Sequence, residues 1–205
     1  MMIRLALSLL LSVTPAFAQV APAPVPPAPA PAAETVRVVM TTSAGPIMIA
    51  LEKDRAPVTT ANFLRYVDAK RFDGIAFYRS MRLPWNAGLI QAGQRETGKL
   101  FKPIAHEPTS QTGLSHTEGA ISMARLAPGT AAADFSIVVG DMTGLDAKPA
   151  DPGFAVFGRV VDGMDVVKTI WMAPRSPTKG EGVMKGEMLE PTVRILTVRR
   201  EMTAK

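Results

Sequence analysis

The chain has 205 residues, of which 47% are hydrophobic and 20% are charged, a composition typical of a globular protein with one domain of ordinary size. It contains no cysteine, which excludes disulfides, thiolate metal sites and a cysteine nucleophile. The formal net charge of +5 comes from basic residues scattered along the sequence, and this scatter argues against a nucleic-acid partner.

The first 18 residues have the pattern of a secretory signal peptide. Arg4 provides a positive start, residues 5–13 form an apolar run, and Ala16-Phe17-Ala18 has the small-x-small form that signal peptidase accepts. The apolar run is shorter than the roughly 20 residues that span a bilayer, so we expect no stable membrane insertion. The pattern predicts export, to the periplasm in a bacterium, and a protein without cysteine suits such an oxidising compartment.

Residues 19–33 consist almost entirely of alanine and proline. Proline fixes the backbone angle φ and lacks an amide donor, so this segment is predicted to be an extended polyproline II linker outside the core. A ligand for a proline-binding partner is the alternative interpretation.

Residues 34–203 are predicted to form the folded domain. Eight runs of β-branched or apolar residues, bounded by turn residues, predict strands. Two segments have helical periodicity, and the first begins with Pro57, a residue suited to the first turn. Many short strands with two isolated helices indicate a β barrel or sandwich. The predicted strands are residues 35–42, 46–52, 75–79, 89–92, 120–124, 135–139, 154–160 and 192–200, and the predicted helices are residues 56–67 and 163–172.

Hydrolytic and metal chemistry find little support in the residue pattern. His106 and His116 are the only histidines, and with Glu107 they lie in a loop-rich segment without the spacing of a metal site. No metal is therefore predicted. Composition alone leaves a Ser-His-Asp triad open, but no serine stands in a recognisable activating context.

Five segments, taken in order, resemble the motifs of the cyclophilins. Residues 72–79 (FDGIAFYR) and 89–93 (LIQAG) are similar to the family's F-D-G-x-x-F-H-R and I-Q-G-G. The similarity extends from about residue 35 to residue 200, which is nearly the whole predicted domain. The other similar segments are residues 57–63 (PVTTANF), 119–125 (GAISMAR), and Leu145-Asp146 followed by 156–167 (VFGRVVDGMDVV).

The resemblance implies a mainly β fold, a closed antiparallel β barrel capped by two α-helices, with an active groove on its outer face. It also implies a peptidyl-prolyl cis-trans isomerase that needs no cofactor and binds proline-containing segments of unfolded or exported proteins, as a monomer. Arg79 takes the place of the catalytic arginine and Gln91 that of its glutamine partner. The predicted substrate-binding residues are Leu89, Met123, Ala124, Asp134, Phe135, Ser136, Leu145, Phe154 and Trp85.

General chemistry supports an arginine in that role. Rotation about an X-Pro bond must break amide resonance, and the barrier is about 18–20 kcal/mol. In the twisted state the imide nitrogen gains a basic lone pair, so a donor aimed at it binds that state more tightly than either planar state. Arginine is always charged and its planar fork has a fixed direction.

The sequence departs from the family within the groove. Gly144 stands where cyclophilins have a tryptophan, and Asp134-Phe135-Ser136 stands in place of Q-F-F. Two hypotheses follow: Trp85 folds back to replace the lost aromatic ring, and Asp134 pairs with Arg79. We also expect weak binding of cyclophilin-directed cyclic peptide inhibitors, because Gly144 offers them no ring.

Two other functions compete with catalysis. The altered groove is compatible with a chaperone-like module that binds proline-containing peptides with little or no turnover. The linker of residues 19–33 leaves open a scaffold in the cell envelope.

Overall fold

The computed structural model describes residues 33–201. The predicted signal peptide, residues 1–18, lies outside this range, as do all but the last residue of the predicted linker and residues 202 and 203 of the predicted domain. Within the described range, no helix combines the length and the apolar character that a membrane crossing requires.

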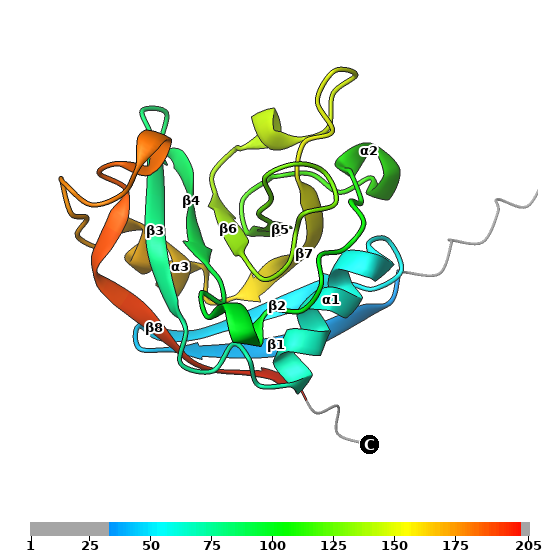
Figure 1. Ribbon diagram of the computed structural model, residues 1–205, viewed down its shortest axis with the longest axis horizontal. Helices are drawn as coiled ribbons and strands as arrows, with labels where there is room; N and C mark the ends of the chain where they lie inside the picture. Colours follow the sequence, from blue (N-terminus) through cyan, green and yellow to red (C-terminus); the bar gives the residue numbers. More distant parts are fainter. Residues whose placement is uncertain (1–32, 202–205) are drawn as a thin grey trace, which may run out of the picture. The chain divides into compact units, whose positions relative to one another are not determined.

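Eight strands form one closed barrel in which every neighbouring pair is antiparallel (Figure 1). Around the barrel the order is β1-β2-β7-β5-β6-β4-β3-β8, and β8 pairs with β1 to close it. The fold class predicted from the sequence is therefore confirmed. The strands are β1 Thr35–Thr42, β2 Gly45–Glu52, β3 Ala76–Leu83, β4 Ala87–Ala92, β5 Ala120–Met123, β6 Phe135–Val139, β7 Ala155–Asp162 and β8 Met188–Arg200.

The described domain has three α-helices, one more than the sequence pattern predicted. The two expected helices are α1, Pro57–Asp68, and α3, Met164–Met172. The third, α2 (Thr109–Thr112), is a single turn that ends at Gly113, whose φ of 67° is the left-handed conformation that glycine adopts readily. A four-residue turn is too short to produce a hydrophobic period, which is why the sequence did not reveal it.

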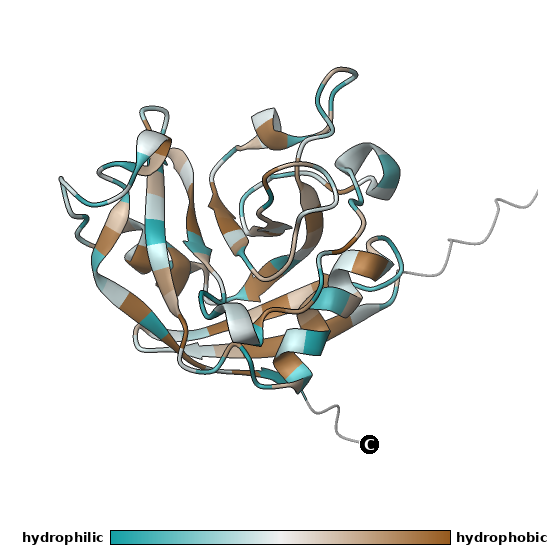
Figure 2. Ribbon diagram, in the orientation of Figure 1, coloured by the Kyte–Doolittle hydropathy of each residue, from teal (hydrophilic) through white to brown (hydrophobic). Residues whose placement is uncertain are grey.

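Aromatic rings fill the interior of the barrel. Phe63 of α1 lies within 4.9–5.4 Å, centroid to centroid, of Phe72, Phe135 and Phe157. All four side chains are at most 1% exposed. Helix α1 alternates hydrophobic and hydrophilic residues (Figure 2), so it covers this interior with one face and presents the other to solvent. Because side chains occupy the inside, a ligand site must lie on the outer face.

A buried carboxylate caps the start of α1. Glu107 is 4% exposed, and its Oε1 accepts the backbone N–H of Val58 at 3.0 Å. Its Oε2 accepts both the backbone N–H and the hydroxyl of Thr59, at 2.7 and 2.6 Å. The first turn of a helix has N–H groups without internal partners and a partial positive charge, so this distant carboxylate satisfies both needs.

The Glu107 cap yields a stability prediction. Glu107→Ala leaves buried donors unpaired and should lower the free energy of unfolding by about 2–4 kcal/mol, measured by urea denaturation. Glu107→Gln, which keeps an acceptor oxygen, should cost less. The control is Glu118→Ala, which removes the half-exposed ion pair with Lys168 and should cost at most about 1 kcal/mol. Equal effects of Glu107→Ala and the control would contradict the cap.

Candidate active site

A groove of about 650 Å³ crosses the outer face of β3, β4, β5 and β6. Eight of the eleven residues that the sequence analysis assigned to the site line this groove. They come from strands and loops far apart in the chain, and the barrel brings them together. They are Arg79, Leu89, Gln91, Ala124, Asp134, Ser136, Leu145 and Phe154.

A β-bulge in β3 sets the direction of Arg79. The pairing of β3 shifts register between Phe77 and Arg79 against both β4 and β8. A bulge interrupts the alternation of a strand, so two successive side chains, Tyr78 and Arg79, both line the groove. Phe77 before them and Ser80 after them are completely buried on the other side.

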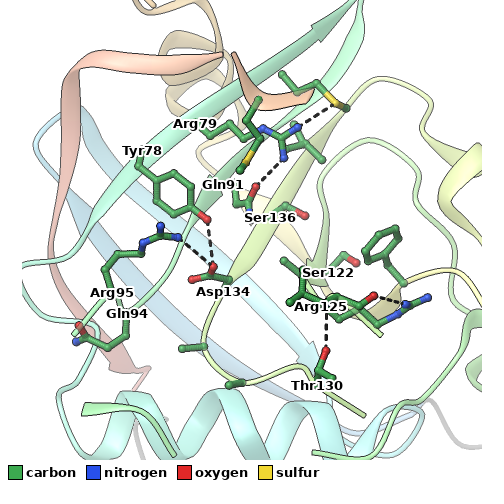
Figure 3. Close-up of a pocket in the computed structure, with 18 of the residues that line it drawn as sticks. Tyr78, Arg79, Gln91, Gln94, Arg95, Ser122, Arg125, Thr130, Asp134 and Ser136 are labelled. Atoms are coloured by element: carbon green, nitrogen blue, oxygen red, sulfur yellow. Dashed lines mark hydrogen bonds and ion pairs between the residues drawn. The ribbon is translucent and has the colours of Figure 1, made fainter. Parts of the chain in front are cut away.

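Two side chains hold the guanidinium of Arg79. Its Nη1 donates to Oε1 of Gln91 at 2.9 Å (Figure 3), as expected from the resemblance. Its Nε donates to Oε2 of Glu187 at 2.7 Å, and its Nη2 lies at the same distance from that oxygen, an ion pair that the sequence did not reveal. Glu187 is 108 positions away in the chain, so no local spacing could have revealed it. The arginine is thus fixed from two sides at the groove.

The hypothesis that Asp134 pairs with Arg79 was wrong. Its Oδ2 instead accepts the hydroxyl of Tyr78 at 3.2 Å and lies 3.5 Å from Nη1 of Arg95 (Figure 3). Gly93 permits this arrangement, since a Cβ there would fall 1.6 Å from Oδ1 of Asp134. Tyr78 and Arg95 therefore hold Asp134 at the groove, away from Arg79.

The titration of this pair reflects its burial. Desolvation raises the pKa of Asp134 above its usual range, and the nearby Arg95 and the Tyr78 hydroxyl only partly oppose it. Burial, together with the Asp134 charge, also raises the pKa of Tyr78, so the phenol stays protonated and serves as the donor.

Met123 and Phe135 were wrongly assigned to the groove. Met123 is 2% exposed and Phe135 is fully buried, and both belong to the core of the barrel. Successive side chains of a strand point to opposite faces, so their neighbours Ser122 and Ser136 face the groove instead.

Trp85 does not replace the missing aromatic ring of the groove. It lies in the turn between β3 and β4, is 66% exposed, and lines a separate hollow of about 350 Å³. This hollow also contains Gly144, the position of the family's tryptophan, and Leu145, which both hollows share. The indole therefore lies beside the vacated position but outside the main groove.

A chain of hydrogen bonds connects the groove-lining residue Ser122 of β5 to the segment that carries Leu145. Nδ1 of His116 donates to Oδ1 of Asp146 at 2.5 Å, and Nε2 of His116 accepts the Ser122 hydroxyl at 2.9 Å. Asp146 also accepts the Ser115 hydroxyl and the backbone N–H of His116. The order is that of a Ser-His-Asp triad, but Ser122 is only 2% exposed, and the hydrogen bonds connect strand β5 to the loop that carries Leu145.

Arg125, which was not predicted as a site residue, holds the part of the groove wall that carries Phe154. Its Nε donates to the carbonyl oxygen of Gly153 at 3.0 Å, and its guanidinium lies 4.9 Å from the ring centroid of Phe154. The side chain of Arg125 is only 8% exposed, so this cation–π contact lies partly out of water. The other groove residues that were not predicted from the sequence are Tyr78, Met81, Gln94, Arg95, Leu100, Ser122, Leu126, Thr130, Ala132, Ala133, Val183 and Met184.

The two candidate metal ligands near His116 have other partners. Glu107 caps α1, as described above, and Nε2 of His106 lies 3.0 Å from the carbonyl oxygen of Pro152.

Comparisons with known proteins agree with this architecture. A family model described as cyclophilin type peptidyl-prolyl cis-trans isomerase/CLD matches residues 37–200. The chain is 38% identical over 144 residues to a peptidyl-prolyl cis-trans isomerase of Acinetobacter baylyi, covering 68% of this chain and 73% of that protein. It is 38% identical over 141 residues to peptidyl-prolyl cis-trans isomerase B of Escherichia coli, covering 65% of this chain and 82% of that protein.

Solved structures show the same fold. A cyclophilin type isomerase of Cryptosporidium parvum, crystallised in the presence of the dipeptide Ala-Pro, superimposes with a TM-score of 0.66 at 19% identity, covering 82% of this chain and 99% of that one. The chain therefore belongs to the cyclophilin-type peptidyl-prolyl cis-trans isomerases, enzymes that interconvert the two forms of X-Pro peptide bonds.

The buried imidazole of His116 yields a prediction on pH. Burial lowers its pKa from the ordinary 6.5, although Asp146 opposes the shift. As pH falls through that ordinary value, the unfolded chain takes up a proton that the folded chain does not. The free energy of unfolding should therefore fall by up to about 1.4 kcal/mol per pH unit, measured by urea denaturation between about pH 7.5 and 5. His116→Asn should flatten this slope, whereas His106→Asn should keep it; the reverse would contradict the assignment.

Proposed function

We propose that this protein isomerises X-Pro bonds with Arg79 as the group that hydrogen-bonds the imide nitrogen of the twisted state. The observation that carries the proposal is the guanidinium at the groove, fixed between Gln91 and Glu187. A donor that is positioned before the substrate arrives needs no rearrangement when the nitrogen lone pair develops. No covalent step and no cofactor is required, because only a rotation takes place.

The apolar part of the groove supplies a place for the proline ring. Leu89, which is 7% exposed, lies two positions before Gln91, the neutral acceptor for Arg79, in strand β4. Ala124, Leu145 and Phe154 add apolar surface from three other segments. A ring held among these side chains would bring the imide nitrogen towards the arginine and exclude water from it.

A non-catalytic peptide-binding module is the second candidate. Ser136 lies at the groove where the family pattern has an aromatic residue, and Gly144 offers no ring. Ser136 enlarges the space within the groove, and Gly144 removes a ring from the hollow beside it, which favours binding of a proline ring without tight positioning. Binding of proline-containing peptides without turnover would select this candidate.

The proposed substrates are proline-containing segments of unfolded exported proteins. The support is the predicted signal peptide of residues 1–18, the proline-rich linker that follows it, and the absence of cysteine from the sequence. These features favour a folding catalyst in the bacterial periplasm.

Replacing Arg79 tests the catalytic assignment. In a coupled isomerisation assay on Ala-Pro peptides, Arg79→Ala should lower kcat/KM by about 10²-fold, the loss typical of one donor to a developing charge. Arg159→Ala, which removes an exposed arginine of β7 outside the groove, is the matched control and should leave activity unchanged. Unchanged turnover in Arg79→Ala would exclude this mechanism.

Gly144→Trp tests whether the groove is divergent in the proposed way. A Cβ at Gly144 would meet no atom within 4 Å, so the backbone has room for the first atom of a side chain there. The variant should bind a cyclophilin-directed cyclic peptide inhibitor at least about tenfold more tightly than wild type, measured by calorimetry. Tight binding by the wild type would show that Gly144 does not weaken the groove.

A further inference from the structure

We propose that Glu187 is a positioning residue for Arg79, and that it sets the direction of the catalytic guanidinium. This inference rests on the proposed function of Arg79 and assigns a role to a residue in the loop that precedes β8. The contact between Glu187 and Arg79 connects the loop before β8 to the groove.

The contact between the two side chains is short and largely shielded from water. Oε2 of Glu187 accepts the Nε–H of Arg79 at 2.7 Å and lies 2.7 Å from its Nη2. The side chains are 15% exposed for Arg79 and 19% exposed for Glu187. Charge-assisted hydrogen bonds of this length in partly buried surroundings are stronger and more directional than those of exposed ion pairs.

Backbone hydrogen bonds on both sides fix the main chain of Glu187. The N–H of Ser80, next to Arg79 in β3, donates to the carbonyl oxygen of Glu187 at 2.8 Å. The N–H of Glu187 donates to the carbonyl oxygen of Met184 at 3.0 Å, which closes the turn before β8. The carboxylate therefore belongs to the framework of the barrel, and its position does not depend on a free loop.

A count of donors shows what remains for a substrate. A guanidinium has five N–H bonds. The Nε hydrogen donates to Glu187 and one Nη1 hydrogen to Gln91, while Nη2 lies 2.7 Å from the Glu187 carboxylate and donates to the sulfur of Met81, a weak acceptor, at 3.8 Å. The second hydrogen of Nη1 and the weakly bonded hydrogen of Nη2 are thus left for the substrate. Glu187 occupies the Nε edge, so it selects the Nη end of the fork as the reacting end.

The two partners of Arg79 differ in charge, and the proposal concerns direction rather than charge. Gln91 is neutral and would hold one nitrogen only. With a single partner the fork could still rotate about the Nη1 contact, whereas the second contact at Nε removes that freedom. A neutral acceptor at position 187 should therefore keep the Arg79 guanidinium in nearly the same orientation as the carboxylate does.

Three variants of the full mature protein test the proposal in the coupled isomerisation assay. Glu187→Ala should lower kcat about tenfold and leave KM within about twofold, because direction matters most in the twisted state. Glu187→Gln keeps an acceptor oxygen and should retain kcat within about threefold of wild type. Glu181→Ala, which removes an exposed carboxylate of the same segment, is the matched control and should match wild type.

A spectroscopic measurement follows the arginine itself. In ¹⁵N-labelled wild type, the side-chain Nε–H resonance of Arg79, assigned by its loss in Arg79→Lys, should be protected from solvent exchange. Protection should disappear in Glu187→Ala and persist in Glu187→Gln and Glu181→Ala. Thermal unfolding of each variant shows whether the fold is intact, and Glu187→Gln carries the test if Glu187→Ala does not fold.

Each outcome decides the proposal. A kcat of Glu187→Ala within twofold of wild type, or above it, would overturn it. A loss in Glu187→Gln as large as that in Glu187→Ala would also overturn it, since charge rather than direction would then matter. If wild type shows no turnover, the proposed function fails, and the Nε–H resonance still decides whether Glu187 positions Arg79.

Discussion

The filled interior of the barrel is the constraint on which the rest of the structure depends. Phe63, Phe72, Phe135 and Phe157 pack against one another inside the strands, so no ligand can enter there. A closed barrel also has no free strand edge to which a peptide could add. Recognition is therefore restricted to the outer face, where chemistry must be built from outward-pointing side chains and from loops. The bulge in β3 places two adjacent side chains, Tyr78 and Arg79, on this outer face, where regular alternation would place only one.

Much of the fold could be predicted from the sequence because it depends on local patterns. The eight strands and the helices α1 and α3 were found from alternation, helical period and turn residues, with boundaries that moved by a few positions. Strand β8 begins at Met188 rather than at residue 192, since Pro191 interrupts the pattern without ending the pairing. Helix α2 was missed because one turn leaves no period.

Residues of the candidate site could be predicted from the sequence only where they belong to a recognisable motif. Arg79 and Gln91 followed from the motif and lie together at the groove. Met123 and Phe135 were misplaced because the resemblance was followed at the expense of strand alternation, which by itself sends Phe135 inward and Ser136 outward. Glu187 and the partners of Asp134 depend on contacts between distant segments, and no spacing in the sequence encodes them.

The hydrogen-bonded chain of Ser122, His116 and Asp146 has a consequence for recognition. It joins β5, which forms one wall of the groove, to the residue beside Leu145, which forms another. The width of the groove is therefore a property of the folded protein before any peptide arrives. A receptor organised in advance loses little conformational entropy on binding, so even a short peptide segment that makes few contacts can be bound in the groove.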